Sequence, residues 1–230
     1  MFKIALDAGH DINTAGKRCL KSLDKNETRE WWLNDRVCDY VEQYLSEYAG
    51  YSLLRMDDSD DGKTSVSLAD RVKKANTFGA DIYISVHHNA GINGGSGGGI
   101  VAFTCPGASS TSVAWRNDLY DTLIANGGLK GNRSNPKAEG DYYVLKNTKM
   151  PATLLELGFM DSKTDVPILL TDEYARNCAK AIADVIVKRG KLTKKAVYKV
   201  QVGAFSNKAD ADRLAAELRG KGYPTYIVKV

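Results

Sequence analysis

The chain of 230 residues is long enough for one ordinary domain and a small second one. Its 43% hydrophobic and 26% charged residues can form a buried core, which excludes a disordered, collagen-like or coiled-coil protein. No apolar run approaches the roughly 18 to 20 residues that a membrane helix needs, and the first residues lead directly into a strand-like segment without a signal peptide. We therefore expect no membrane partner and no Sec-dependent export.

Short apolar runs alternate with helix-like stretches along residues 1–190, which predicts an α/β fold. We expect a twisted, mixed but mostly parallel sheet with helices on both faces. The expected strands are residues 4–6, 51–56, 82–86, 100–104, 142–145 and 153–157. The expected helices are residues 28–48, 66–78, 110–125 and 172–188, the first with apolar residues at spacings of three and four.

A glycine-rich segment, Gly94-Gly95-Ser96-Gly97-Gly98-Gly99, lies between two of these strands. Its spacing does not fit the G-x-G-x-x-G fingerprint, and it leads into a strand rather than a helix. A phosphate-binding loop is therefore not favoured, and we expect a mobile loop beside a cleft.

The last part of the chain predicts a separate small unit. Residues 191–197 are polar and basic, which indicates a linker. Residues 198–202, 207–221 and 225–230 then predict a strand, a helix and a strand, a βαβ unit of about 33 residues. This is below the roughly 40 residues at which a chain usually folds without help, so we expect the unit to need a partner surface.

The net charge of +4 is concentrated in the same part of the chain. Residues 191–230 carry nine Lys or Arg against three Asp or Glu, a net charge of +6, whereas residues 1–190 carry −2. Such a basic segment can face nucleic acid, anionic lipid or an anionic polymer such as cell wall. We expect no nucleic-acid partner, because no recognised reading motif or stacking surface accompanies the charge.

Four cysteines stand singly in the sequence: Cys19, Cys38, Cys105 and Cys178. They form no C-x-x-C pair and have none of the spacings of a zinc ribbon or finger. We expect free thiols in a reducing compartment.

The three histidines, His10, His87 and His88, each lie at the end of a predicted strand. Parallel strands bring their carboxyl ends to one edge of the sheet, so we expect the histidines to converge on one crevice. A catalytic zinc usually takes three protein ligands and a water, two His and one Glu being an established set. The spacing leaves Glu27 and Glu30, both at the start of the helix after His10, as alternatives for the carboxylate.

Glu156 stands in an otherwise apolar predicted strand. Burying a carboxylate costs free energy unless the group is paired or used. Burial also raises the pKa of a carboxyl group toward the range in which a general base or acid works near neutral pH. The alternative is a glutamate at the strand end that faces solvent.

Five segments carry a resemblance to a known family. They are Leu6-Asp7-Ala8-Gly9-His10, Glu30-Trp31-Trp32-Leu33-Asn34, Val66-Ser67-Leu68 through Arg71 to Ala75-Asn76, Ser85-Val86-His87-His88-Asn89-Ala90, and Pro151 through Phe159. In this order they resemble the motifs of the zinc-dependent N-acetylmuramoyl-L-alanine amidases of bacterial and phage cell-wall lysis. The resemblance covers residues 1–190 and is more specific than any single motif.

The resemblance implies a zinc ion held by three of the residues already named. His10 matches the family's first ligand, and His87, in a Ser-x-His-x-Asn pattern, matches the third. The family's acidic ligand stands four residues before an Asn or Leu, which Glu30 does with Asn34, so the resemblance favours Glu30 over Glu27.

The resemblance also assigns the remaining residues of the site. Glu156 matches the family's catalytic glutamate, and His88 falls at a variable position and is expected to be a bystander. The sequence departs from the family where Ala8 replaces a common Pro and Asp11 a common Gly. These changes affect the loop after the first strand and leave the expected ligands intact.

The implied reaction is hydrolysis of the amide that joins N-acetylmuramic acid to L-alanine in peptidoglycan. Two alternatives remain: a zinc peptidase that cuts within the stem or cross-linking peptides, and a non-catalytic wall-binding protein. Without a signal peptide, we expect the enzyme to reach the wall after cell lysis, as phage endolysins do, or by a non-Sec route, as sporulation autolysins do.

The segment from Tyr198 through Ser206 resembles the opening of a SPOR-type peptidoglycan-binding domain. That domain usually contains two βαβ halves, and one half is visible here. We expect two chains each to contribute a half and to form a homodimer through residues 198–230. The alternative is a truncated or flexible remnant.

Overall fold

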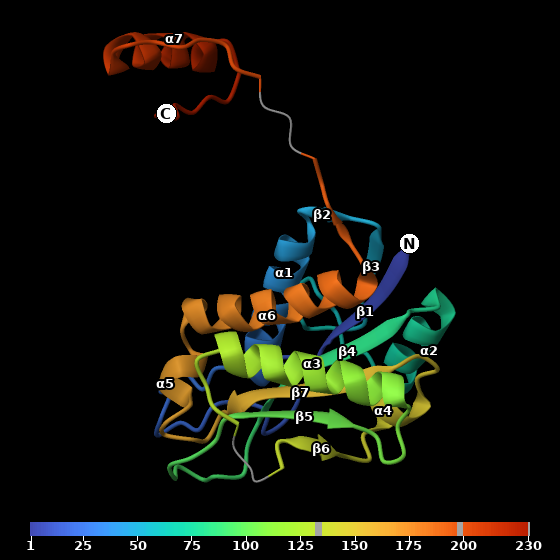
Figure 1. Cartoon of the computed structure of the whole chain (residues 1–230). Helices are drawn as coiled ribbons and strands as arrows, with labels where there is room; N and C mark the ends of the chain where they lie inside the picture. The colour runs from blue at the N-terminus through green and yellow to red at the C-terminus, as the bar shows by residue number, and fades with distance from the viewer. Residues whose placement is uncertain (132–134, 197–199, 230) are drawn as a thin grey trace. The chain divides into compact units, whose positions relative to one another are not determined.

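The computed structural model describes residues 1–131, 135–196 and 200–229, and its contacts divide the chain into two compact units, Met1–Lys195 and Ala196–Val230. Among the described residues, the first unit contains a six-stranded sheet with the order β3-β1-β4-β7-β5-β6 (Figure 1). Its strands are β1 (Phe2–Ala8), β3 (Tyr51–Arg55), β4 (Ile82–Asn89), β5 (Ile100–Thr104), β6 (Lys137–Glu139) and β7 (Ala152–Phe159).

The pairing confirms the expected mixed and mostly parallel sheet. β1 runs parallel to β3 and β4, β4 runs parallel to β7, and β6 runs parallel to β5. Only the β5–β7 pair is antiparallel among the pairs of this described sheet. The carboxyl ends of β1, β4 and β7 therefore meet at one edge, where open α/β sheets place their sites.

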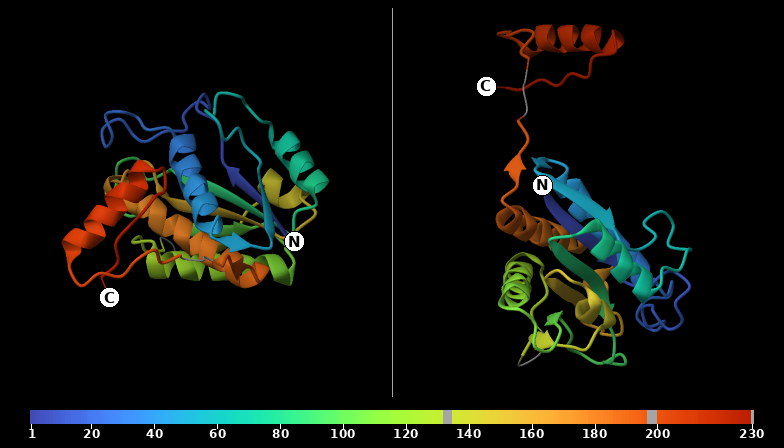
Figure 2. Two further views of the ribbon diagram at one scale, coloured as in Figure 1. Left: turned by 90° about the horizontal axis from the view of Figure 1, so that it is seen from above. Right: turned by 90° about the vertical axis from the view of Figure 1, so that its right-hand side faces the viewer.

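Helices cover both faces of the sheet, also as expected (Figure 2). One face packs against α1 (Glu30–Leu45), α3 (Ser110–Asn126) and α6 (Asp172–Gly190), and the other against α2 (Leu68–Phe78) and α4 (Tyr143–Asn147). Successive strand residues alternate between the two apolar clusters, because neighbouring side chains of a strand point to opposite faces. In β4, Ile82 and Ile84 lie in the first cluster and Tyr83 in the second.

The helix boundaries follow from local chemistry. Ser67 accepts a hydrogen bond from the Asp70 N–H and so caps the start of α2, and Thr171 does the same for the Tyr174 N–H at the start of α6. α2 ends at Phe78, and the C-cap Gly79 follows with a φ of 66°, in the left-handed region that glycine adopts without strain.

The strand expected at residues 142–145 is wrong. This segment forms the short helix α4, and Val144 and Leu145 are both buried in the same apolar cluster. Two adjacent residues of a strand would point to opposite faces, so this packing requires a helix. The edge of the sheet beside β5 is formed by β6, whose sequence Lys-Ala-Glu has no apolar pattern that could have revealed a strand.

Three short elements complete the first unit: α5 (Val166–Leu169), β2 (Tyr48–Ala49) and β8 (Thr193–Lys194). β8 lies within the expected linker and pairs with β2, whereas residue 197 of that linker lies outside the described residues. The four cysteines are free, three of them buried. In the described part of the chain, no helix is both long and apolar enough to cross a membrane.

The second unit contains the expected helix, α7 (Lys208–Gly220), which Asn207 caps by accepting the Asp210 N–H. The expected flanking strands are not formed within residues 200–229. A strand needs a neighbour for its backbone hydrogen bonds, and the two segments do not pair with each other there. Residues 198, 199 and 230 of these expected strands lie outside the described residues.

Candidate active site

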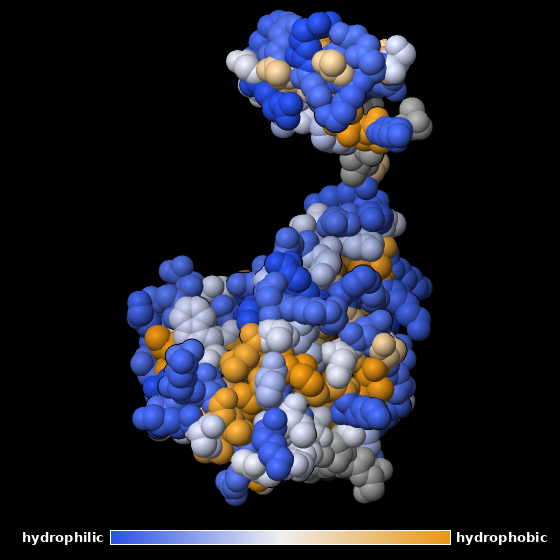
Figure 3. Space-filling model, turned by 90° about the vertical axis from the view of Figure 1, so that its left-hand side faces the viewer, coloured by the Kyte–Doolittle hydropathy of each residue, from blue (hydrophilic) through white to orange (hydrophobic). Residues whose placement is uncertain are grey.

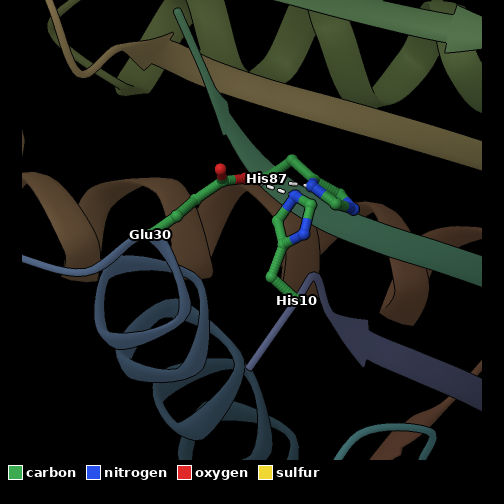
Figure 4. A group of neighbouring side chains, drawn as sticks. All are labelled: His10, Glu30 and His87. Atoms are coloured by element: carbon green, nitrogen blue, oxygen red, sulfur yellow. Dashed lines mark hydrogen bonds and ion pairs between the residues drawn. The ribbon is translucent and has the colours of Figure 1, made fainter. Parts of the chain in front are cut away.

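Three side chains from separate elements converge at the carboxyl edge of the sheet (Figure 4). His10 follows β1, Glu30 opens α1, and His87 lies in β4. Glu30 Oε1 lies 3.0 Å from His87 Nδ1 and 3.4 Å from His10 Nε2, and each residue offers one ligand atom within 4.8 Å of the others. Three donors of this kind so close together could hold a metal ion.

Glu27, the alternative that the spacing left open, points elsewhere. Its carboxylate pairs with Arg18 at 3.3 Å and with Lys21 at 3.9 Å. Glu27 also has a φ of 49°, in the left-handed region, so the chain turns sharply just before α1. Among the two candidates, the tertiary structure brings only Glu30 to the histidines.

The backbone at the end of β1 is shaped to admit the His87 ring. A Cβ atom at Gly9 would overlap the His87 imidazole, so only glycine fits there. His10 follows with a φ of 68°, and its imidazole meets the His87 ring edge to face, with centroids 4.9 Å apart. The two rings therefore support each other beside Glu30.

Arg71 of α2 holds the turn that follows β1 through hydrogen bonds to its backbone. Its guanidinium donates to the Ala8 carbonyl at 2.7 Å and to the His10 carbonyl at 2.6 Å, and it forms a buried ion pair with Asp7. Two hydroxyl groups complete the environment of this carboxylate: those of Tyr83 and Ser85, at 2.8 and 2.9 Å. The roles of Arg71 and Asp7 were not predicted from the sequence, although a charged residue such as Asp7 in an apolar strand is a usable signal.

His88 is buried and connects the site to α1. Its backbone N–H donates to Glu30 Oε1 at 3.2 Å, and its Nδ1 lies 2.7 Å from Asn34 Oδ1. The Asn34 amide in turn donates to the Gly9 carbonyl at 3.0 Å. His88 is not in the group that could hold a metal, but it helps to position Glu30 and the turn that carries His10.

The charges and hydrogen bonds around Glu30 stabilise its ionised carboxylate beside the two imidazoles. Burial would raise the pKa of Glu30, but the hydrogen bond with His87 and the charges of both histidines lower it to about 2. Burial lowers the pKa of His10 to about 4, against the attraction of Glu30. The pKa of His87 is raised, because its hydrogen bond with Glu30 and the charge of Glu30 outweigh burial. Glu30 is therefore ionised and His10 neutral at pH 7.

One oxygen of the buried Glu30 carboxylate is available to bind a cation. Glu30 Oε2 is buried and accepts no hydrogen bond from the described residues. Lys17 lies 3.6 Å away, with its side chain 43% exposed. Two imidazole nitrogens and a carboxylate are ligands that zinc takes in catalytic sites, so these residues fit that ion.

Glu156 lies in β7, next to the strand that carries His87. The parallel register pairs the Cα atoms of His87 and Glu156, so their side chains leave the same face of the sheet. Glu156 is 8% exposed and its charge contributes to raising the pKa of His87. The alternative of a glutamate facing solvent is therefore wrong.

The glycine-rich loop after β4 is tied to the segment that follows β7. Asp161 Oδ2 accepts three backbone N–H groups at 2.8, 2.7 and 2.7 Å, those of Gly91, Ile92 and Asn93. Asp165 Oδ2 accepts the Gly99 N–H at 2.6 Å and the Phe159 N–H at 2.9 Å. The loop expected to be mobile is thus hydrogen-bonded at both of its ends.

The molecular surface at the carboxyl edge of the sheet is not uniformly polar (Figure 3). Figure 3 shows the side on which α5 lies in Figure 1, and apolar side chains gather there in a band across the first unit, bordered by hydrophilic ones. A surface of this kind suits a ligand with both apolar and polar groups.

Comparison with known proteins identifies the family. Residues 4–188 match the family model described as N-acetylmuramoyl-L-alanine amidase, and residues 194–230 match the SPOR domain. The N-acetylmuramoyl-L-alanine amidase CwlM of Bacillus licheniformis is 31% identical over 230 residues, which cover 99% of this chain and 85% of that protein. The sporulation-specific N-acetylmuramoyl-L-alanine amidase of Bacillus subtilis (strain 168) is 30% identical over 231 residues, with the same coverage.

A solved structure supports the same assignment. The catalytic domain of CwlV, an N-acetylmuramoyl-L-alanine amidase from Bacillus (Paenibacillus) polymyxa var. colistinus, superposes with a TM-score of 0.71 at 25% identity. The match covers 84% of this chain and 100% of that one. The chain belongs to the N-acetylmuramoyl-L-alanine amidase family, hydrolases that cleave the amide bond between N-acetylmuramic acid and L-alanine in the peptidoglycan of the cell wall.

Proposed function

We propose that His10, Glu30 and His87 hold a zinc ion and that Glu156 is the catalytic base and acid of the amidase. The observation that carries this proposal is the position of Glu30 Oε1, which lies within 3.4 Å of one nitrogen of each imidazole. Three such ligands leave one coordination position open, as catalytic zinc sites require.

The proposed chemistry divides the work between the ion and the protein. A zinc ion held here would polarise the scissile carbonyl and lower the pKa of the attacking water toward about 7. Glu156 would accept the proton of this water while the new C–O bond forms. It would then deliver the proton to the L-alanine nitrogen as the C–N bond breaks, releasing a free amine and the lactyl carboxylate.

Substitutions at these positions separate metal binding from turnover. Glu156→Ala should keep zinc and lose turnover by about 100- to 10,000-fold, the usual contribution of a general acid–base group. His10→Ala should lose both zinc and turnover. Glu27→Gln is the matched control, because its carboxylate pairs with Arg18 outside the site, and it should keep both.

Zinc per chain is measured by mass spectrometry, and turnover by analysis of the muropeptides released with and without a chelator. The expected product is an intact stem peptide with a free L-alanine amino terminus. A Glu156→Ala variant that still digests walls would refute the role of Glu156. Full zinc content in both His10→Ala and Glu30→Gln would refute the ligand set.

For the second unit we propose a role in holding the enzyme on the wall. Residues 194–230 match the SPOR domain, and residues 191–230 carry a net charge of +6. Attraction to an anionic wall raises the local concentration of the catalytic unit without changing its chemistry.

We further propose that residues 198–230 associate with a second copy of the chain. Within residues 200–229, Ala215 is the one buried residue. Val200, Val202 and Val228 are 86%, 62% and 62% exposed, and Phe205 and Tyr223 are exposed as well. Burying such a surface against its own copy would stabilise both partners through the hydrophobic effect.

Light scattering coupled to size-exclusion chromatography tests this association on the full chain. We expect a dimer, and we expect Val202→Asp to shift it toward the monomer without changing turnover of small substrates. A monomer at all concentrations, with protection of the residue 200–229 amides showing that the unit is folded, would contradict the proposal.

A further inference from the structure

Lys17 lies beside the proposed zinc ligands, on the segment that precedes α1. This segment folds back on itself, with an antiparallel bridge between Arg18 and Arg29, and the Glu30 N–H donates to the Lys17 carbonyl at 3.0 Å. The register therefore places Lys17 opposite Glu30. Residues directly opposite each other in such a pairing project their side chains to the same side, so the Lys17 side chain leaves the backbone on the side of the Glu30 carboxylate.

The Lys17 ammonium is only loosely held by the protein. Its Nζ lies 3.6 Å from Glu30 Oε2, which is longer than an N–H···O hydrogen bond of about 2.7 to 3.2 Å. Glu30 is its one ion-pair partner among the described residues, and the Lys17 side chain is 43% exposed. An ammonium has three donors and no acceptor. Lys17 therefore has donors left for a ligand that approaches from solvent.

The ammonium lies on the outer side of the Glu30 carboxylate. Figure 4 shows one oxygen of Glu30 directed toward the histidines and the other directed away from them. Oε1 is the oxygen that lies 3.0 Å from His87 Nδ1 and 3.4 Å from His10 Nε2, whereas Lys17 is paired with Oε2. The charge of Lys17 still reaches the site, because it adds to the burial that lowers the pKa of His10 to about 4. An anion bound to Lys17 would thus lie next to the reacting groups without being one of them.

Metal binding at the three ligands would free Lys17 further. A divalent cation held by Glu30 would offset the charge of this carboxylate and repel the ammonium. Lys17 would then carry a positive charge on a flexible four-carbon side chain without a strong partner. The side of the site next to Glu30 Oε2 would therefore attract an anionic group of the substrate.

The distances indicate which anionic group of the substrate is within reach. A carboxylate held at about 2.8 Å from Lys17 Nζ would lie within about 6 Å of Glu30 Oε2. In a stem peptide the first carboxyl group that can be free beyond the scissile amide belongs to the residue after L-alanine. Two residues of extended chain span about 7 Å, and the carboxyl groups of later residues are at about 10 Å or more. The carboxyl group of the second stem residue is thus the one that Lys17 can reach.

We propose that Lys17 binds the free carboxylate of the second stem residue and thereby determines a preference for stem peptides in which this group is not amidated. A charge-assisted hydrogen bond from an ammonium favours a carboxylate over a primary amide, because the amide lacks the negative charge. This inference rests on the proposed position of the catalytic centre and adds a residue that determines substrate specificity.

Kinetics on two muropeptides test the role of Lys17 in the full chain. The two substrates differ only in this group, which is a carboxylate in one and a primary amide in the other. We expect the wild type to have a KM about five- to tenfold lower for the carboxylate substrate, the scale of one charged hydrogen bond at a partly exposed site. Lys17→Met should raise the KM of the carboxylate substrate to that of the amide and leave kcat unchanged on both. Lys17→Arg, which keeps the charge, should retain part of the preference.

Lys21→Met is the matched control. It removes the same charge from the same segment, but Lys21 pairs with Glu27 and its side chain is 77% exposed. We expect this variant to keep the preference of the wild type, so a general effect of net charge is separated from binding at Lys17. Raising the salt concentration should reduce the preference of the wild type and leave the KM ratio of Lys17→Met unchanged.

Two further measurements have readouts other than turnover. Zinc per chain should be the same in Lys17→Met and in the wild type, because the proposed ligands are retained. In the Glu156→Ala background, calorimetry should show tighter binding of the carboxylate muropeptide, and adding Lys17→Met should remove the difference. If Glu156→Ala still turns over substrate, the assignment of Glu156 fails, whereas the KM comparison at Lys17 still decides the present proposal.

Three results would overturn the proposal. The first is an equal KM of the wild type for the two muropeptides. The second is a preference in Lys17→Met as large as that of the wild type. The third is loss of zinc, or an equal loss of turnover on both muropeptides, in Lys17→Met, which would mean that Lys17 holds Glu30 in place instead of binding the substrate.

Discussion

At the scale of single residues, the candidate metal centre depends on a buried ion pair that does not itself face the site. Arg71 and Asp7 are both almost completely buried, and the Arg71 guanidinium also donates to the His10 carbonyl. A buried charge is stable only when it is paired and hydrogen-bonded. The position of His10 is therefore coupled to the ionisation of Asp7.

Replacing Asp7 by Asn should destabilise the protein in a pH-dependent way. Burial would raise the pKa of Asp7, but the charge of Arg71 and the hydrogen bond from Tyr83 lower it below its usual value of 3.8. The ionised group thus stabilises the folded state fully above about pH 4. At pH 7 we expect Asp7→Asn to lower the free energy of unfolding by about 3 to 5 kcal/mol, because Arg71 is left without its partner.

The difference between wild type and variant should shrink as the pH falls through the lowered pKa of Asp7, because the stabilisation is lost when the group is protonated. Urea titrations between pH 7 and pH 2, in the presence of a chelator, measure this difference. Asp121→Asn is the control, since the Asp121 carboxylate is 62% exposed where it meets Lys137, and it should change stability by less than about 1 kcal/mol. A constant difference at every pH would contradict the coupling.

At the scale of elements, the loop after β4 is anchored to the segment that follows β7. Asp161 and Asp165 follow β7, and together they hold both ends of the loop through backbone N–H groups. Hydrogen bonds from several N–H groups to one ionised carboxylate oxygen are stronger than bonds between neutral groups, so these contacts anchor the loop firmly. The loop thereby joins the ends of two neighbouring strands, β4 and β7, which carry His87 and Glu156.

Replacing Asp161 by Ala should loosen this loop. Three backbone N–H groups lose their acceptor, and we expect a loss of about 1 to 3 kcal/mol in the free energy of unfolding. Hydrogen exchange of residues 91–99 should become faster, whereas exchange in β1 should not change. Asp141→Ala, at an exposed ion pair with Lys146, is the control. Unchanged exchange of the loop in Asp161→Ala would show that Asp165 alone fixes it.

At the scale of the whole molecule, the two units differ in how they are stabilised. Residues 1–195 contain two large apolar clusters on the two faces of the sheet. Residues 200–229 bury little beyond Ala215. The first unit therefore has a core of its own, whereas the described part of the second has almost none.

A chain of residues 1–195 should fold alone. We expect its Tm to lie within a few degrees of that of the full chain and its turnover of a monomeric muropeptide to be unchanged, because both apolar clusters and the site are retained. Sedimentation with purified walls should show weaker binding by 1–195, and binding by the full chain should weaken with salt because residues 191–230 are basic. Equal wall binding by both chains would contradict a role of the second unit.

The sequence by itself determined the features that depend on local chemistry. Apolar periodicity predicted the alternation of strands and helices and the mostly parallel sheet, because buried faces require apolar residues at regular spacing. The positions of His10 and His87 at the ends of predicted strands also predicted that the two side chains approach each other, since parallel strands end at one edge of the sheet. Glu156 stood out because a carboxylate in an apolar strand needs a reason to be there.

The tertiary structure decided what depends on contacts between distant segments. Spacing could not distinguish Glu27 from Glu30, because the turn before α1 determines which carboxylate faces the histidines. The helix α4 (Tyr143–Asn147) formed in place of the strand expected at residues 142–145, because both Val144 and Leu145 have apolar partners on one face of the sheet. The contact between Arg71 and the His10 carbonyl joins residues 61 positions apart, and no local pattern encodes such a contact.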